Sequence, residues 1–447
     1  MRTTLLLLAA CLSAPSALAQ NCTPTWDYTS GLPGAPSGYV GAMTIYEGDL
    51  VASGSFPNMA GAPNTQFLAR YNRSSNAWSG FGAGLGSGIS NGFGTSFAHY
   101  QNNLYVGGFF ADAAGLPDTK SIARWDGTAF HSLGTGWRFD SVNAVWTLLT
   151  SDAIGGQEKL YIGGGFDNIA GVPAGCIASW DGTTLTPLAS TMTLVGINPL
   201  VMSMAIFDDG QGGGKQLYIG GRFSAINGTP INMVARWNGS TWSAVGTNLT
   251  PRNATAEVDS MLVFNDGTGP ALYIGGTNLR VNADGINRAT AKWNGLTWSP
   301  VGQALTGRTW TLAEFDDGSG KKLYAGGNQT ALGCIYRLDG GIWTTLDGGA
   351  NAQVIRIMPE GSHFYAGGSF VTVNGQTANH LVARNGCVGA CQCAADFNQD
   401  GGVDGGDVSA FFSDWEAAAG CSDVNQDGGV DGSDINAFFT VWEAGGC

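Results

Sequence analysis

The sequence predicts an all-β fold, a seven-bladed β-propeller of four-stranded antiparallel blades, followed by a small α-helical domain. A glycine-containing unit recurs seven times along the chain, which is typical of a propeller. Glycine occupies 71 of 447 positions and only 12% of residues are charged, which favours many short strands joined by tight turns. The end of the chain instead contains two acidic loops, each followed by a helical apolar pattern.

The repeated unit contains four strand-like segments. In the fourth copy they begin at Val201, Leu217, Met233 and Thr241, and each is bounded by Gly, Asn or Asp. The second segment has an apolar start followed by glycine in every copy. Its seven copies begin at Leu50, Leu104, Leu160, Leu217, Leu272, Leu323 and Phe364. Four antiparallel strands repeated in this way predict propeller blades.

Arg and Trp recur at fixed places in the unit. The recurring Arg residues are Arg70, Arg124, Arg236 and Arg384. The third segment repeats Trp125, Trp180, Trp237 and Trp293, and the fourth repeats Trp78, Trp242, Trp298 and Trp343. Residues repeated around a ring pack blade against blade more often than they bind one ligand, so we predict structural roles for these side chains.

The two ends of the repeat region complement each other. The seventh copy ends at Cys387 without a Trp strand, and a Trp strand beginning at Thr23 precedes the first copy. We therefore expect the N-terminal strand to complete the last blade, which removes two exposed sheet edges. Cys22 and Cys387 would then flank one hairpin, which predicts a disulfide between them, with Cys391 as a competing partner.

The first residues have the pattern of a secretory signal peptide. A positive Arg2, a short apolar run and a small-residue cleavage site at Ala17–Ala19 predict a signal over residues 1–19. The alternative is a membrane anchor, but the run is short for one, and no other stretch approaches a spanning length. We expect a secreted or surface-displayed protein, and export permits disulfides.

The balance of charge is acidic. The net charge is −14, and residues 394–447 contain eleven Asp or Glu and no Lys or Arg. A chain without a basic patch is not expected to bind nucleic acid or anionic membranes. The acidic tail therefore calls for a separate explanation.

Two tail segments match an EF-hand-type calcium loop. Residues 396–407 read DFNQDGGVDGGD and residues 423–434 read DVNQDGGVDGSD, with oxygen side chains at loop positions 1, 3, 5, 9 and 12 and glycine at position 6. The predicted ligands of one calcium ion are Asp396, Asn398, Asp400, the Gly402 carbonyl, Asp404 and Asp407. Those of the second are Asp423, Asn425, Asp427, the Gly429 carbonyl, Asp431 and Asp434. The alternative is an acidic linker.

Each loop leads into an amphipathic helical pattern. The apolar positions of the first are Val408, Phe411, Phe412 and Trp415, and those of the second are Ile435, Phe438, Phe439 and Trp442. In so small a domain these side chains either form its own core or present a partner surface.

These motifs resemble two known families. The glycine doublet, the "ARW(D/N)G" strand and the following Trp resemble kelch-type repeats and propeller repeats of bacterial exported proteins. The two loop–helix units over residues 394–447 resemble a type I dockerin. We therefore expect a propeller over residues 20–391 and a dockerin-like domain over residues 392–447. The dockerin resemblance implies calcium-dependent folding and protein–protein interaction with a cohesin-like partner, and attachment to a cell-envelope protein is an alternative.

Any ligand site in the propeller is expected where the seven copies differ. Residues near the innermost strands that break the repeat are Asp140, Asp259, Glu314, Trp137, Trp146 and Trp310. The four histidines, His99, His131, His363 and His380, fall in no metal or triad motif and are expected to be structural or surface residues.

Two functions are compatible with this organisation. In the first, the propeller binds a carbohydrate or protein ligand and is displayed by its dockerin-like module. In the second, it is a polysaccharide-degrading glycosidase or lyase delivered by that module, since carboxylates converge at the centre of some propellers. We favour binding because no acid–base constellation is recognisable in the sequence, which leaves catalysis uncertain.

Overall fold

The computed structural model describes residues 24–28, 37–82, 92–134, 144–169, 171–282, 284–328, 333–386, 405–416 and 430–443, and the single residues 395, 397, 403, 422 and 424. Its contacts divide the chain into two compact units, one of them Thr25–Gly386 and the other containing the residues from Cys387 onward. The predicted signal peptide, Cys22, Cys387, Cys391 and the predicted boundary at 391 lie outside the described residues. Neither helix in the described part of the chain is long and apolar enough to cross a membrane.

The first three sheets of Thr25–Gly386 are antiparallel and four-stranded. One contains β2 (Tyr39–Tyr46), β3 (Asp49–Ser55), β4 (Leu68–Asn72) and β5 (Ala77–Gly80). The next contains β6 (Phe93–Tyr100), β7 (Asn103–Phe109), β8 (Ile122–Trp125) and β9 (Phe130–His131). The third contains β10 (Val145–Ser151), β11 (Lys159–Gly164), β14 (Ile177–Trp180) and β15 (Leu185–Pro187).

The next two sheets follow the same order. The fourth contains β17 (Leu200–Asp208), β18 (Lys215–Arg222), β21 (Val234–Trp237) and β22 (Trp242–Ala244). The fifth contains β24 (Glu257–Asn265), β25 (Pro270–Val281), β26 (Arg288–Trp293) and β27 (Trp298–Pro300). The fifth sheet has one more strand, β23 (Leu249–Pro251), which pairs with the far end of the long β25.

The remaining sheets complete the unit. The sixth contains β28 (Thr309–Asp316), β29 (Lys321–Gly327), β30 (Ile335–Asp339) and β31 (Ile342–Thr345). The seventh contains β32 (Val354–Glu360), β33 (His363–Gly368), β36 (Leu381–Asn385) and β1 (Thr25–Asp27). Small loop pairings are formed by β12 (Asn168–Ile169), β13 (Val172–Pro173), β16 (Met192–Thr193), β19 (Ala225–Ile226), β20 (Thr229–Pro230), β34 (Thr372–Val373) and β35 (Gln376–Thr377).

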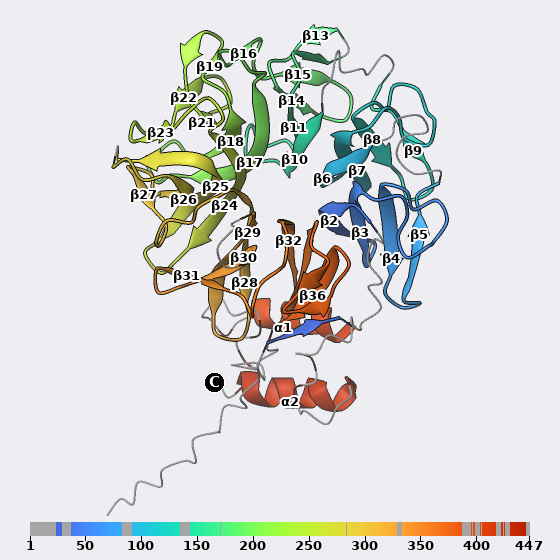
Figure 1. Ribbon diagram of the computed structural model, residues 1–447. Coiled ribbons are helices and arrows are strands. Elements are labelled where there is room, and N and C mark those ends of the chain that lie inside the picture. The colour runs from blue at the N-terminus through green and yellow to red at the C-terminus, as the bar shows by residue number, and fades with distance from the viewer. Residues whose placement is uncertain are drawn as a thin grey trace, which may run out of the picture. The chain divides into compact units, whose positions relative to one another are not determined.

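The sheets are arranged radially around a common centre (Figure 1). The innermost strands are β2, β6, β10, β17, β24, β28 and β32; each contacts the next, and β32 contacts β2, so the described sheets form a closed ring. The apolar clusters lie between neighbouring sheets: one of them joins Phe81 of the first sheet to Leu104 and Trp125 of the second. This arrangement of antiparallel sheets is a β-propeller.

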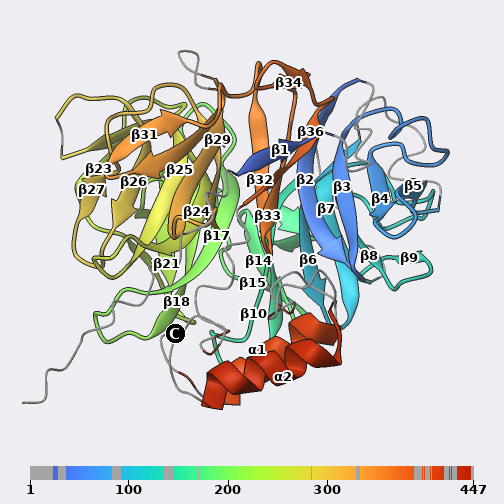
Figure 2. The same ribbon diagram turned by 90° about the horizontal axis from the view of Figure 1, so that it is seen from below.

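The N-terminal strand pairs with the last sheet, as the sequence predicts. β1 lies antiparallel beside β36, with Trp26 opposite Arg384 (Figure 2). Trp26 packs edge-on against Phe364, with ring centroids 5.9 Å apart, and the Arg384 guanidinium lies 5.1 Å from the Trp26 ring centroid. Trp26 thus takes the place that Trp242 occupies opposite Trp237 in the fourth sheet.

The register corrects one prediction about the repeated arginines. Arg236 lies opposite Tyr218, the second residue of its "LYIGG" strand, whereas Arg384 lies opposite Phe364, the first residue of the equivalent strand. A shift of one residue places a side chain on the other face of a sheet. Arg384 therefore occupies the position of the third-strand Trp, where it stacks on Trp26 and forms an ion pair with Asp347.

The fourth-strand tryptophans join one sheet to the sheet before it. The Nε1 of Trp298 donates a hydrogen bond of 2.7 Å to the Val245 carbonyl, and that of Trp343 donates one of 3.0 Å to the Val301 carbonyl. Each acceptor lies just beyond the fourth strand of the preceding sheet. The predicted packing role of these residues is confirmed.

The glycine pair in the second strand of six of the seven sheets has a steric cause. At Gly275, an added Cβ would lie 2.7 Å from the Thr309 Cγ2 of the next innermost strand. At Gly276, it would lie 2.1 Å from the Glu257 carbonyl oxygen of its own sheet. The first sheet has Ser53 in place of the first glycine, and the next innermost strand compensates with Gly94, whose amide donates a 2.7 Å hydrogen bond to the Ser53 hydroxyl.

The C-terminal unit contains two helices, α1 (Gly405–Glu416) and α2 (Gly432–Glu443). Phe411 and Phe438 are fully buried and their rings are stacked, with centroids 4.2 Å apart and planes 4° from parallel. The Trp415 indole donates a 3.0 Å hydrogen bond to the Asp431 carbonyl. Core packing is therefore confirmed for Phe411 and Phe438. The other apolar side chains of the two patterns, Val408, Phe412, Trp415, Ile435, Phe439 and Trp442, are only partly buried.

Removing the indole donor at Trp298 tests the contact between sheets. Trp298 is 1% exposed, so Trp298→Phe leaves the buried Val245 carbonyl without its partner. We expect a loss of about 1–3 kcal/mol in the free energy of unfolding, measured by urea denaturation. Leu296→Ala is the control, because Leu296 is 66% exposed and its truncation is expected to have little effect. Equal stability of Trp298→Phe and the wild type would contradict the assigned role.

Candidate binding site at the propeller centre

Every innermost strand contains a β-bulge at an equivalent position. In β24 the pairing with β25 shifts between Val258 and Ser260, and in β28 the pairing with β29 shifts between Thr309 and Thr311. A bulge adds one unpaired residue and turns its side chain out of the regular alternation. The residues between the shifted pairs are Gly41, Thr95, Trp146, Met202, Asp259, Trp310 and Ile355.

All seven bulge residues line one central pocket of about 320 Å³. The described residues that complete its lining are Tyr39, Phe93, Gly94, Gln353, Arg356 and Ser369. The wall is therefore largely apolar and aromatic, with few polar groups. This volume falls at the lower end of the range for small-molecule sites.

One side of the pocket is built around Arg308. Its guanidinium contacts Asp259 through two hydrogen bonds, of 2.9 Å from Nε and 2.5 Å from Nη2, and it contacts Glu257 through Nη1 at 2.5 Å. The same guanidinium lies 3.5 Å from the centroid of the Trp310 ring. Arg222 approaches Glu257 at 3.6 Å, so two carboxylates and two guanidinium groups balance one another. This network holds the Trp310 ring in place.

Asp259 is deeply buried within this network. Only 1% of its side chain is exposed, and this burial raises its pKa to about 7, although the Arg308 guanidinium opposes the shift. A carboxyl group held by a bidentate guanidinium is positioned as a structural partner. The described lining residues bring no second carboxylate beside it.

Arg356 presents a different environment. It lines the pocket from β32, and no hydrogen bond or ion pair joins it to any residue that the structure describes. Part of the Arg356 side chain is exposed to water. The protein that surrounds this side chain inside the ring partly desolvates the guanidinium, which lowers its pKa. On β2, the innermost strand next to β32, burial raises the pKa of Tyr39 to about 12, so its hydroxyl keeps its proton at neutral pH.

Three of the six predicted site residues meet in this pocket. Asp259, Trp146 and Trp310 line it, whereas Asp140 and Trp137 lie outside the described residues. Glu314 is not among the lining residues and was wrongly expected there. It lies four residues beyond the Trp310 bulge, about 13 Å along an extended strand, and pairs with Lys321 at 3.2 Å.

Sequence reasoning missed Tyr39, Phe93, Met202 and Arg356. A signal for Met202 was present, because it occupies the same place in its copy as Trp146 and Asp259 do in theirs. Arg356 could not be found in this way. It follows the bulge residue Ile355, at the place where the other copies have small residues such as Thr147 and Ser203.

The four histidines have separate environments. His99 lies 3.1 Å from the Thr44 hydroxyl, His131 lies 2.7 Å from Asp126, and His363 lies 3.3 Å from Glu360. His380 is buried, and its Nδ1 has no hydrogen-bond partner in the part of the chain that the structure describes. None of the four lines the central pocket.

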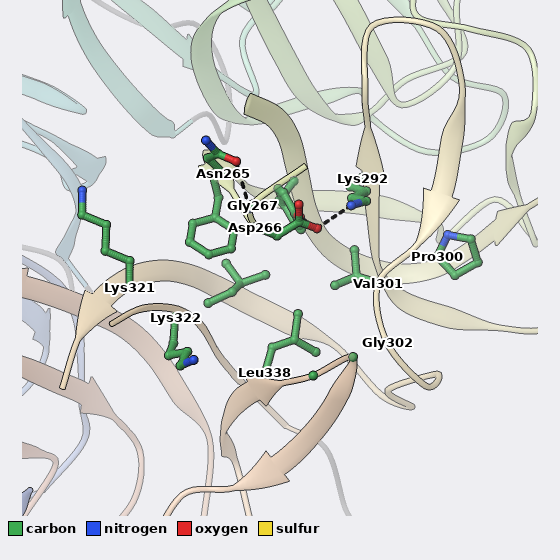
Figure 3. Close-up of a pocket in the computed structure, with 15 residues that line it drawn as sticks. Asn265, Asp266, Gly267, Lys292, Pro300, Val301, Gly302, Lys321, Lys322 and Leu338 are labelled. Atoms are coloured by element: carbon green, nitrogen blue, oxygen red, sulfur yellow. Dashed lines mark hydrogen bonds and ion pairs between the residues drawn. The ribbon is translucent and has the colours of Figure 1, made fainter. Parts of the chain in front are cut away.

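A second, outer pocket of about 630 Å³ lies between the fifth and sixth sheets (Figure 3). Lys292 pairs with Asp266 at 2.5 Å, and the Tyr273 hydroxyl donates a 2.8 Å hydrogen bond to the same carboxylate. Lys321 and Lys322 also line this pocket. It is larger than the central pocket, but it collects residues from only two sheets, so we regard the central pocket as the better candidate site.

The predicted calcium loops are described only in part. Asp407, Asp431 and Asp434 are described, and the first and last of these are fully buried in the first turns of α1 and α2. The Asp431 amide donates a 2.9 Å hydrogen bond to the Asp434 carboxylate. The other predicted ligands, Asp396, Asn398, Asp400, Gly402, Asp404, Asp423, Asn425, Asp427 and Gly429, lie outside the described residues.

No protein-family model matches this chain, and no curated protein matches it. A structure of YCF48 bound to D1 peptide has 12% identity and a TM-score of 0.44, covering 82% of this chain and 96% of that chain. A chain of the Mitotic Checkpoint Complex has 14% identity and a TM-score of 0.45, covering 86% and 99%. The WD40 β-propeller domain of Doa1 has 11% identity and a TM-score of 0.41, covering 79% and 94%. These likenesses are too distant to assign a function.

The raised pKa of Asp259 predicts a pH dependence of stability. The Asp259 carboxyl loses its proton near pH 3.8 in the unfolded chain and near pH 7 in the folded chain. The folded chain therefore binds this proton more tightly, and the stability that the bound proton contributes is complete below about pH 4 and is lost as the pH rises toward 7. We expect the free energy of unfolding of the wild type, relative to that of Asp259→Asn, to fall by roughly 4 kcal/mol between about pH 4 and about pH 8. Urea denaturation of both proteins across this range measures it, and a pH-independent difference would contradict the shift.

Proposed function

We propose that this chain is an exported binding protein with two working parts. The seven sheets form a seven-bladed, kelch-like propeller that holds a ligand in its central pocket. The C-terminal helix pair is a dockerin-like module that attaches the propeller to a cohesin-like partner or to a cell-envelope protein. Export rests on the signal-peptide pattern of residues 1–19.

One observation carries the binding role. Seven equivalent bulge positions hold six different residue types, with Trp occurring twice, and all seven residues line one pocket. The packing positions of the repeat behave otherwise, because they hold the same Trp or Gly in most sheets. Variation at the positions that meet at the centre supports a site specialised for one ligand.

Buried carboxylates support the calcium-dependent module. Asp407 and Asp434 occupy the twelfth position of the two predicted loops, and both are fully buried. Both carboxylates have partners within the protein, among them the Asp431 amide for Asp434, and these contacts hold them at the loop position that supplies a calcium ligand. Oxygen donors at positions 9 and 12 of the second loop, Asp431 and Asp434, fit a calcium ion, which would offset the repulsion among the acidic residues. The stacked Phe411 and Phe438 would then depend on the metal for their placement.

A thermal-shift experiment tests the binding role. The full chain is screened against neutral sugars, amino acids and organic acids, with Met202→Trp as a variant whose larger side chain fills the central pocket. We expect at least one probe to raise the melting temperature of the wild type by several degrees, because binding to the native state stabilises it. The shift should disappear in Met202→Trp. A shift of the melting temperature that persists in this variant would argue against the central pocket. The absence of any shift in the wild type would argue against it as well.

Removal of calcium tests the module. Chelation is expected to lower the far-ultraviolet circular dichroism signal of the helices, and added calcium should restore it. Asp434→Asn should require roughly tenfold more calcium for the same recovery, because it loses a charged ligand. Glu416→Gln is the matched control, since Glu416 lies on the exposed surface of α1 and is not a predicted ligand. A helical signal that is insensitive to chelation would refute the assignment.

A further inference from the structure

The central pocket contains a cation without a counter-charge. Arg356 has no hydrogen bond or ion pair with the described residues, whereas the nearby Arg308 is fully engaged by Asp259 and Glu257. The only carboxylate among the described lining residues, Asp259, is therefore already committed to Arg308. The Arg356 side chain is exposed to the water of the pocket, so its unpaired guanidinium is accessible to an anionic ligand, to which it can donate charge-assisted hydrogen bonds.

The depressed pKa of Arg356 agrees with this geometry. Its cause is desolvation alone, with no opposing carboxylate. A ligand carboxylate placed beside the guanidinium would replace the missing counter-charge, and a planar fork of donors matches the two oxygens of a carboxylate.

The other residues that line the pocket favour a ligand that contains a six-membered ring. Tyr39, Phe93, Trp146 and Trp310 line the pocket from four different strands, and Phe93 lies 5.7 Å from Tyr39 in an edge-on arrangement. Flat aromatic faces pack against other rings and against the apolar faces of sugars. The Trp310 Nε1 is buried and has no hydrogen-bond partner among the described residues, and an acceptor atom on a bound ligand is one way to satisfy it.

We propose that the central pocket binds a small ligand that carries a carboxylate on a six-membered ring, with Arg356 as the carboxylate-binding residue. This inference rests on the binding role proposed above and adds the chemical class of the ligand. Both a sugar acid and an aromatic acid carry this group, and the volume of about 320 Å³ accommodates either.

Titration of the full chain with matched probes tests the inference. Glucuronate is compared with glucose, benzoate with benzamide, and acetate serves as a carboxylate without a ring. Binding is followed by calorimetry and by the intrinsic tryptophan fluorescence of the chain, to which the pocket residues Trp146 and Trp310 contribute. We expect at least one ring carboxylate to bind about tenfold or more tightly than its neutral counterpart and than acetate. The affinities for glucuronate and benzoate decide between a sugar acid and an aromatic acid.

Three variants assign the effect to Arg356. Arg356→Gln should weaken binding of the ring carboxylate about tenfold or more, whereas Arg356→Lys, which keeps the charge but not the planar fork, should have an intermediate affinity. Lys322→Gln removes a positive charge from the outer pocket of Figure 3 and should leave binding unchanged. Circular dichroism confirms that each variant is folded.

The possible failures have different meanings. If neutral rings bind as well as the acids, and Met202→Trp abolishes binding while Arg356→Gln does not, the pocket binds a ligand but the inferred carboxylate is wrong. Acetate binding as tightly as the ring acids overturns the inferred ring. If Met202→Trp changes the affinity for none of the probes, the binding role of the pocket itself is wrong.

Discussion

Steric crowding at the centre of the ring is the constraint on which the rest of this propeller depends. Where the innermost strands approach one another, the neighbouring second strand has room only for glycine, as the 2.7 Å approach of Thr309 to a Cβ at Gly275 demonstrates. The only described exception, Ser53, is accommodated because Gly94 replaces the larger residue facing it. A side chain on either glycine of the pair would push a sheet outward and open the ring.

The same crowding produces the candidate site. The second glycine of each pair receives the backbone of a bulge, as at Gly276 beside the Glu257 carbonyl. Each bulge turns one residue out of the sheet, and the seven sheets together supply seven wall residues of six different types. The scaffold is therefore made of repeated residues, while the binding role that we propose falls to the positions that vary from sheet to sheet. Asp259, Trp310 and Arg308 form a rigid side of this wall, and Arg356 remains available to a ligand.

Much of the fold follows from repetition in the sequence, but the fine register does not. The seven units, their four strands and the pairing of β1 with β36 could be predicted, because turn residues and the missing Trp strand mark them. The displacement of Arg384 to the face of Trp26 could not, since it depends on one residue of register. Asp259, Trp146 and Trp310 stood out as departures from the repeat, whereas Arg356 lies one residue beyond the bulge and needed the folded ring to reveal it.

The orientation of the bulge residues is the central claim, and cysteine labelling tests it most directly. Met202 occupies a bulge and lines the pocket, whereas its neighbour Val201 is fully buried against Gly163. Met202→Cys and Val201→Cys are treated in the native state with a small neutral thiol reagent, and the modified peptide is quantified by mass spectrometry. The account predicts rapid modification of Met202→Cys and protection of Val201→Cys. Protection of Met202→Cys together with modification of Val201→Cys would contradict it.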